Sequence, residues 1–205
     1  REDGSFGDGT QTSWAFAAWL ELGDQAELVC RLVQEVDSAG VFTTGIFGTM
    51  FAFELLARYG HSDVLERWLL RNENPSLLGM LSNGNGALIE MFDDPLASCD
   101  HAMFSSYDQW FYQGLGGIFV DRGARGCDQA VIKPYLSRVV DRFVCSWFVP
   151  TGEISVAWKR GADGVTMTVD IPGDIDAVVE VPWGCEVISR SDEGRRVIVQ
   201  VKEGK

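Results

Sequence analysis

The chain has 205 residues, 46% hydrophobic and 23% charged, which is typical of a globular protein that buries a sizeable core. Thirty acidic residues oppose seventeen basic ones, and the resulting formal charge of -13 argues against nucleic acid and anionic membranes as partners. A neutral ligand, such as a sugar, meets no such electrostatic penalty.

The cysteines and the start of the chain bear on cofactors and compartment. The five cysteines are widely spaced and form no CxxC pair, so we expect neither a metal site nor another cofactor. Their odd number favours a reducing compartment and thus weakly the cytoplasm. The chain begins at Arg1 with neither an initiator Met nor a signal peptide, so we expect it to be cut from a longer protein.

The first part of the chain shows helical periodicity. Apolar residues recur at helical spacing from Trp14 to Leu22, and Asp24 with Glu27 forms a capping signal for a second helix. Residues 45–59 are apolar on nearly all sides and should be largely buried, and Ser62 can cap the helix that follows. These elements predict two antiparallel helical hairpins.

The middle of the chain is rich in turn-forming residues. Residues 72–86 contain Pro75 and the run Asn-Gly-Asn-Gly, which predicts irregular backbone of a length that is often functional. A helix is expected again after Ser106, with apolar residues from Tyr107 to Ile118 on one side.

Past residue 122 the hydrophobic period becomes that of strands. Alternation at 154–158, 165–171 and 197–201, with turn signals between these runs, predicts an antiparallel sandwich. The sequence therefore predicts an α+β chain of two segregated units, residues 1–122 and 123–205.

Two residues are candidates for chemistry. Glu90 lies among apolar neighbours, where a carboxylate can serve as a general base, with Asp93 and Asp94 close behind it. His101 precedes an aromatic helix, from which a polar side chain can project into a cleft. The alternatives are that Glu90 caps a helix or pairs with an arginine and that His101 is structural.

Several short motifs, in this order, resemble glycoside hydrolase family 78, the α-L-rhamnosidases. They are GTQT at 9–12, TTGIFGT at 43–49, YGH at 59–61, NPS at 74–76, NG at 83–84, IEMFD at 89–93, DH at 100–101, WFY at 110–112, IKP at 132–134, GEISVAW at 152–158 and IPG at 171–173. The resemblance covers nearly the whole chain.

The resemblance implies a fold and an activity. It implies the C-terminal hairpins of an (α/α)6 barrel over 1–122, a β-sandwich over 123–205, and inverting hydrolysis of terminal α-L-rhamnosyl linkages without a cofactor or metal. Glu90 falls at the general base and His101 at a rhamnose contact, with Phe92 and Asp93 beside the base. The general acid would lie in a preceding part of the parent protein, so this chain alone would be inactive.

The match also has departures. The family pattern places Trp where this chain has Ile89 and Phe92, and Tyr where it has Ala102. Two alternatives therefore stay open: an (α/α)6-barrel glycosidase or lyase for another sugar, and a non-catalytic carbohydrate-binding or scaffold protein. The expected partners are a rhamnosyl glycoside or oligosaccharide, the missing N-terminal part and, for the isolated chain, a second copy.

Overall fold

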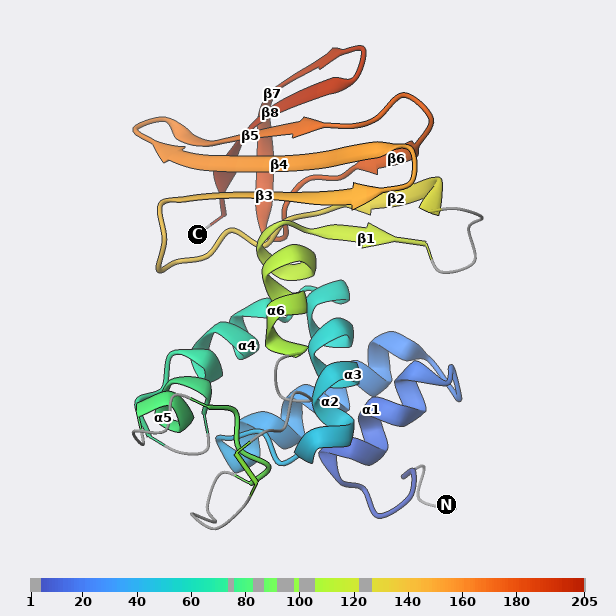
Figure 1. Ribbon diagram of the computed structural model, residues 1–205, viewed down its shortest axis with the longest axis vertical. Coiled ribbons are helices and arrows are strands. Elements are labelled where there is room, and N and C mark those ends of the chain that lie inside the picture. The colour runs from blue at the N-terminus through green and yellow to red at the C-terminus, as the bar shows by residue number, and fades with distance from the viewer. Residues whose placement is uncertain are drawn as a thin grey trace. The chain divides into compact units, whose positions relative to one another are not determined.

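The computed structural model describes residues 5–73, 76–82, 87–91, 98–99, 106–121 and 127–204. Their contacts divide the chain into two compact units, one ending at Trp110 and the other beginning at Phe111. The described part of the first unit is helical and that of the second is mostly strand (Figure 1). The chain is therefore a helical-hairpin region followed by a predominantly antiparallel β region.

Apart from α5 (Leu77–Ser82), the helices of the first unit begin close to where the sequence predicts. They are α1 (Gln11–Trp19), α2 (Gln25–Ala39), α3 (Gly45–Arg58), α4 (Ser62–Leu69), α5 (Leu77–Ser82) and α6 (Tyr107–Trp110). The predicted capping signal of α2 is confirmed, because Asp24 Oδ1 accepts the Glu27 N–H at 2.9 Å. Ser62, by contrast, is the first helical residue of α4 rather than its cap.

An aromatic cluster forms the core between α3 and α4. The rings of Phe42, Phe53 and Trp68 meet edge to face with centroids 5.4 to 5.6 Å apart, and all three side chains are buried. Each such pair contributes about 0.5–1.5 kcal/mol beyond the burial of its area. The cluster fixes α4 and the segment before α3 on one side of α3.

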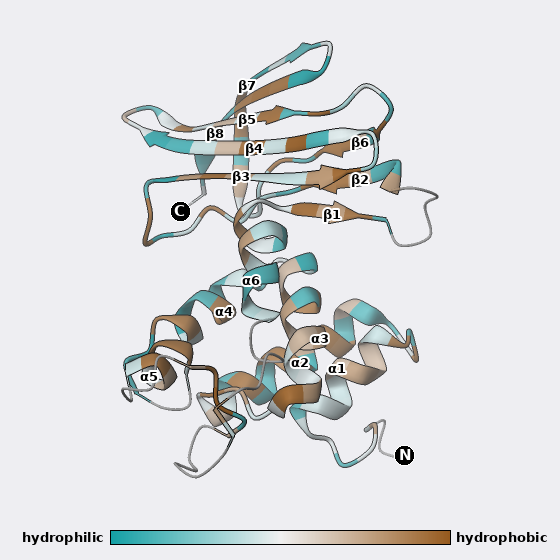
Figure 2. Ribbon diagram, viewed as in Figure 1, coloured by the Kyte–Doolittle hydropathy of each residue, from teal (hydrophilic) through white to brown (hydrophobic). Residues whose placement is uncertain are grey.

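Helix α3 is apolar over most of its length (Figure 2). Its second half, from Ala52 to Ala57, is buried as expected. Its first half is not, because Phe47 is 71% and Met50 39% exposed. The expectation that this helix is buried nearly all round is thus met only toward its C-terminal end.

The strands of the second unit form two sheets in the described part of the chain. The smaller one has the order β1-β2-β6, from Ile118–Val120, Gln129–Ile132 and Asp176–Val179. The larger one has the order β3-β4-β5-β8-β7, from Arg142–Val149, Gly152–Gly161, Gly164–Asp170, Arg196–Glu203 and Cys185–Glu193. The first strand precedes residue 122, where the sequence analysis expects the period to change.

The alternation read from the sequence matches one face of the larger sheet. Ile154, Val156 and Trp158 of β4 are buried. On the neighbouring strands β5 and β8, the buried residues are Val165, Met167, Val169, Val197, Val199 and Val201. The Trp158 indole N–H donates to the carbonyl of Leu115 in the π-helical segment η2 (Phe111–Leu115), which satisfies its polar group inside the core.

One pairing differs from the expected antiparallel arrangement. Strands β2 and β6 run parallel, with Ile132 opposite Val179, whereas the other paired strands of the described region are antiparallel. Parallel partners need a long connection between them, and here it contains β3, β4 and β5.

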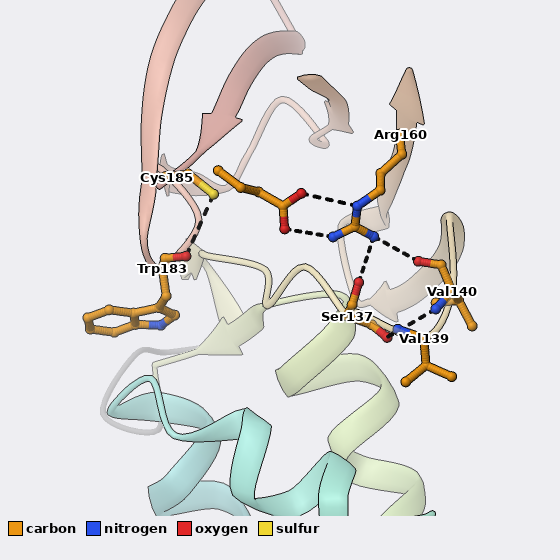
Figure 3. Close-up of polar contacts among 7 residues, drawn as sticks. Ser137, Val139, Val140, Arg160, Trp183 and Cys185 are labelled. Carbon is orange, nitrogen blue, oxygen red and sulfur yellow. Dashed lines mark hydrogen bonds and ion pairs between the residues drawn. The ribbon is translucent and has the colours of Figure 1, made fainter. Parts of the chain in front are cut away.

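A partly exposed arginine network connects a loop to the end of the chain (Figure 3). The Arg160 guanidinium on β4 donates to both carboxylate oxygens of Glu203, at 3.1 and 2.7 Å. It also donates to the carbonyls of Ser137 and Val140, at 2.6 and 3.0 Å. The hydrogen bonds to Glu203 raise the pKa of Arg160, so the guanidinium stays charged and holds the loop before β3.

Among the described residues, no helix is both long and apolar enough to cross a membrane.

Candidate functional site

Of the candidate residues, the structure describes Glu90. Phe92, Asp93, Asp94 and His101 lie outside the described residues. The geometry of the candidate site is therefore that of Glu90 and of the elements that hold it.

Glu90 lies in an irregular segment that follows α5 and is hydrogen-bonded to the chain further along. Its backbone N–H donates to the Ser98 carbonyl at 2.9 Å. The preceding residue, Ile89, donates its backbone N–H to the sulfur of Met80 at 3.3 Å. Glu90 and Ile89 are half-buried, and Met91 is 44% exposed. The backbone of Glu90 is thus held on both sides while the residue as a whole stays partly exposed.

Helix α5, which carries Met80, was not expected, because the sequence analysis predicts irregular backbone over 72–86. The fully buried Ser76 begins it: its Oγ accepts the Gly79 N–H at 2.8 Å and donates to the Arg71 carbonyl at 2.7 Å. The signal was present in the sequence, since a serine followed by Leu77, Leu78, Met80 and Leu81 is a capped apolar helical turn.

An acid on α3 was not among the candidate residues predicted from the sequence. Glu54 is only 3% exposed, and its carboxylate accepts hydrogen bonds from Gln109 at 2.8 Å and from Arg58 at 3.2 Å. Next to Gln109, the Trp110 indole N–H donates to the Ser62 hydroxyl of α4 at 3.2 Å. Helix α6 is thereby joined to both α3 and α4. This acid is held by protein partners on packed helices.

The threonine-rich motifs meet around Gln11. The side chain of Gln11 is 3% exposed, accepts the Thr43 N–H at 2.7 Å and donates to the Val41 carbonyl at 2.9 Å. The Thr12 hydroxyl donates to the Thr44 carbonyl at 3.1 Å. These bonds fix the turn into α3, which gives the motifs at 9–12 and 43–49 a structural task.

The described residues line an open pocket of about 290 Å³ between α2 and α4. Its charged groups already have partners, because Arg67 pairs with Asp37 at 3.0 Å and Arg71 donates to the carbonyl of Gly40, the residue that ends α2. Glu90 is not among its lining residues. The pocket therefore adds nothing to the candidate site.

Neither a cofactor site nor a metal centre emerges from the described residues, in which no cluster of three His, Cys, Asp or Glu could hold a metal ion. None of the five cysteines forms a disulfide.

Two family models match the chain, one for each part. Residues 1–115 match the bacterial alpha-L-rhamnosidase 6 hairpin glycosidase domain, and residues 117–196 match the bacterial alpha-L-rhamnosidase C-terminal domain. The chain belongs to the bacterial α-L-rhamnosidase family. The first match contains Glu90 and every helix of the first unit.

Individual relatives agree with this assignment. An alpha-L-rhamnosidase of Alteromonas sp. strain LOR is 26% identical over 200 residues, which are 91% of this chain and 22% of that protein. One of Formosa agariphila is 26% identical over 144 residues, which are 67% of this chain and 15% of that protein. The chain thus spans about a fifth of the length of the family members that it matches.

The fold agrees with that of a solved family member. The crystal structure of Streptomyces avermitilis alpha-L-rhamnosidase, determined in complex with L-rhamnose, superposes with a TM-score of 0.75 and 21% sequence identity. The match covers 99% of this chain and 22% of that one. The two parts of the chain therefore have the fold of a rhamnosidase segment.

Proposed function

We propose that this chain is the C-terminal portion of an inverting α-L-rhamnosidase, with Glu90 as its general base. One observation carries the proposal: the family models match the helical and the β part in the order found in rhamnosidases, and Glu90 lies within the first match. The helical hairpins of residues 1–122 would form the last part of an (α/α)6 barrel. Residues 123–205 would form its β-sandwich.

The chemistry requires two carboxyl groups. Glu90 would take a proton from a water molecule that attacks the anomeric carbon of the rhamnosyl residue. A protonated carboxyl group would give its proton to the departing glycosidic oxygen. In inverting glycosidases the two groups stand about 6.5–9.5 Å apart, which leaves room for the water. The acid would come from a part of the protein outside this chain, so the 205 residues alone would be inactive.

The anchoring of Glu90 supports its assignment. Its backbone is held by Ser98, and its neighbour Ile89 by Met80, while the residue as a whole stays partly exposed. A general base needs such a fixed yet accessible position, because the attacking water must reach the carboxylate. The buried Glu54 lacks that access, since it is 3% exposed and bonded to Gln109 and Arg58.

The remaining candidates would bind the sugar. His101 would hold a rhamnose hydroxyl, and Phe92 and Asp93 would line the site beside the base. The substrate would be a rhamnosyl glycoside or oligosaccharide. Because Ile89 and Phe92 stand where the family pattern has Trp, the rival activity is that of a related barrel enzyme on another sugar.

The test uses the longer protein that contains this chain, a panel of aryl glycosides, and the variants Glu90→Gln, Asp93→Asn and Asp94→Asn. Loss of a general base lowers the rate by about 10²–10⁴. We therefore expect Glu90→Gln to lower turnover of the α-L-rhamnoside by about this factor while the sugar still binds. Glu73→Gln, on an exposed residue outside α5, is the matched control.

Azide separates the base from the alternatives, because this small anion attacks without losing a proton and should restore turnover to Glu90→Gln. Normal turnover in Glu90→Gln with loss in Asp93→Asn or Asp94→Asn would move the base to that residue. Binding of rhamnose without turnover by the unmodified protein would favour a non-catalytic carbohydrate-binding function.

A further inference from the structure

Met80 occupies an unusual position next to the candidate base. Its side chain is 1% exposed, yet its sulfur faces a backbone N–H, that of Ile89, at 3.3 Å. A thioether sulfur is a weak hydrogen-bond acceptor, and a buried methionine is ordinarily a core residue. Here the sulfur satisfies a part-buried amide of the residue directly before Glu90.

The sulfur is itself held firmly. Met80 lies in α5, where its N–H donates to the Ser76 carbonyl at 2.9 Å. The hydroxyl of Ser76 joins the start of α5 to the Arg71 carbonyl, just after α4 ends. An unbroken series of contacts therefore runs from α4 through Ser76 and Met80 to the backbone at Ile89.

We propose that Met80 is a positioning residue for Glu90, acting through the hydrogen bond from Ile89 to its sulfur. This inference rests on the proposed function of Glu90. The Ser98 carbonyl holds Glu90 from the other side. Together the two hydrogen bonds fix the position of the backbone at Ile89 and Glu90. They thereby limit the positions that the Glu90 carboxylate can occupy.

The consequence for catalysis is a loss of alignment rather than of binding. A displacement of about 1 Å in a reacting group can cost about 100-fold in rate. Leucine has nearly the volume of methionine but no acceptor, so Met80→Leu keeps the packing and deletes the bond. Met167→Leu is the matched control, because Met167 is fully buried in β5 of the other unit.

The first measurement needs no substrate and uses the 205-residue chain. Amide hydrogen exchange by NMR should find the Ile89 N–H protected in the unmodified chain and exchanging at least about tenfold faster in Met80→Leu. Met167→Leu should leave Ile89 unchanged. Equal protection in Met80→Leu and in the unmodified chain would overturn the proposal.

The second measurement is a double-mutant cycle in the longer active protein. Met80→Leu should lower kcat on the order of tenfold with KM changed less than about twofold. In the Glu90→Gln background the same change should cost less than about twofold, because Met80 acts through Glu90. An equal loss in both backgrounds, or none in the unmodified protein, would overturn the positioning role.

The two proposals fail in different ways. If Glu90→Gln keeps its kcat, Glu90 is not the base, and both the proposed function and the positioning role in catalysis are overturned. If Glu90→Gln loses kcat but Met80→Leu does not, only the positioning role is overturned.

Discussion

The carboxylate of Glu54 accepts a hydrogen bond from the side-chain amide of Gln109 across 2.8 Å, which joins α3 to α6 over 55 residues of sequence. Since the carboxylate is 3% exposed, its partners replace water almost completely. We expect Glu54→Ala to lower the free energy of unfolding by about 1–3 kcal/mol, the cost of stranding a buried polar partner. Chemical denaturation checks this, with Arg31→Ala, which removes an exposed pair at 4.0 Å, as a control expected to stay within about 0.5 kcal/mol.

The hydrogen bonds of the Gln11 side chain should also make a measurable contribution to stability. Its amide bonds to Thr43 and Val41, so Gln11→Ala removes an acceptor and a donor from a part-buried turn. We expect a loss of about 1–3 kcal/mol in thermal or chemical unfolding. Gln34→Ala, on the exposed face of α2, should change stability by less than about 0.5 kcal/mol. Equal effects of the two variants would show that these hydrogen bonds contribute nothing.

Arg160 and Arg196 offer a matched comparison in the second unit. Each donates two hydrogen bonds to one carboxylate, but only Arg160 also reaches two carbonyls. A lysine ammonium cannot bond to the Glu203 carboxylate and to both carbonyls at once. Arg160→Lys should therefore lower the free energy of unfolding by on the order of 1–2 kcal/mol. Arg196→Lys should cost much less, because water screens its exposed ion pair. A larger loss for Arg196→Lys in urea unfolding would contradict the prediction.

Two thiols should react slowly for an electrostatic reason. Burial raises the pKa of Cys145, and likewise that of Cys185, from 9.0 to about 11. At pH 8 their thiolate fractions are then about 100-fold lower than that of a thiol titrating at 9.0, because each pKa unit is a factor of ten. Mass spectrometry after iodoacetamide treatment should find the exposed Cys30 modified before Cys145 and Cys185.

The same shifts set the sign of a pH effect on stability. Between pH 9 and about 11 the unfolded chain loses these protons while the folded chain keeps them. The folded state therefore binds more protons, and the free energy of unfolding must fall as the pH rises through this window. Replacing both cysteines by alanine should make the free energy of unfolding less dependent on pH in this window. An equally steep decrease in that variant would show that the two cysteines are not its cause.

The apolar residues at the start of α3 should make the isolated chain associate. Phe47 is 71% and Met50 39% exposed, a combination that in a rhamnosidase barrel would face the remaining hairpins. We expect self-association in analytical ultracentrifugation and binding of a hydrophobic dye, both reduced by Phe47→Ser. Phe148→Ser, at an equally exposed position on β3, is the control. A monodisperse, dye-free monomer at high concentration would count against the expectation.

The spacing of apolar residues predicted those elements that bury only one face. Helix α2 and strands β4, β5 and β8 have one buried face each, so their spacing in the sequence survives in the structure. The sequence of strand β3 does not alternate between apolar and polar residues. The strand lies at the edge of its sheet with Val144 and Phe148 exposed, so apolar residues occupy both faces and the alternation disappears.

The candidate site was predictable as a region but not as a geometry. The position of Glu90 came from its neighbours and from the family resemblance, and its role stays a prediction. What holds its backbone could not be foreseen, because Met80 and Ser98 reach it through tertiary contacts that no local period encodes. Glu54 was hidden for the opposite reason, since one acid in an apolar helix resembles a solvent-facing residue until its partner Gln109 is known.

The parallel pairing of β2 with β6 constrains the order in which the second unit can form. Residues 129–132 of β2 cannot pair until residues 176–179 of β6 are present. The chain between them folds into the hairpins β3–β4 and β4–β5. Bringing such distant segments together costs the entropy of loop closure before any stabilising contact between them can form. The neighbouring hairpins close over short turns, so they should form first and bring the ends of the long connection together. A ribosome must therefore release residue 179 before the smaller sheet can be completed.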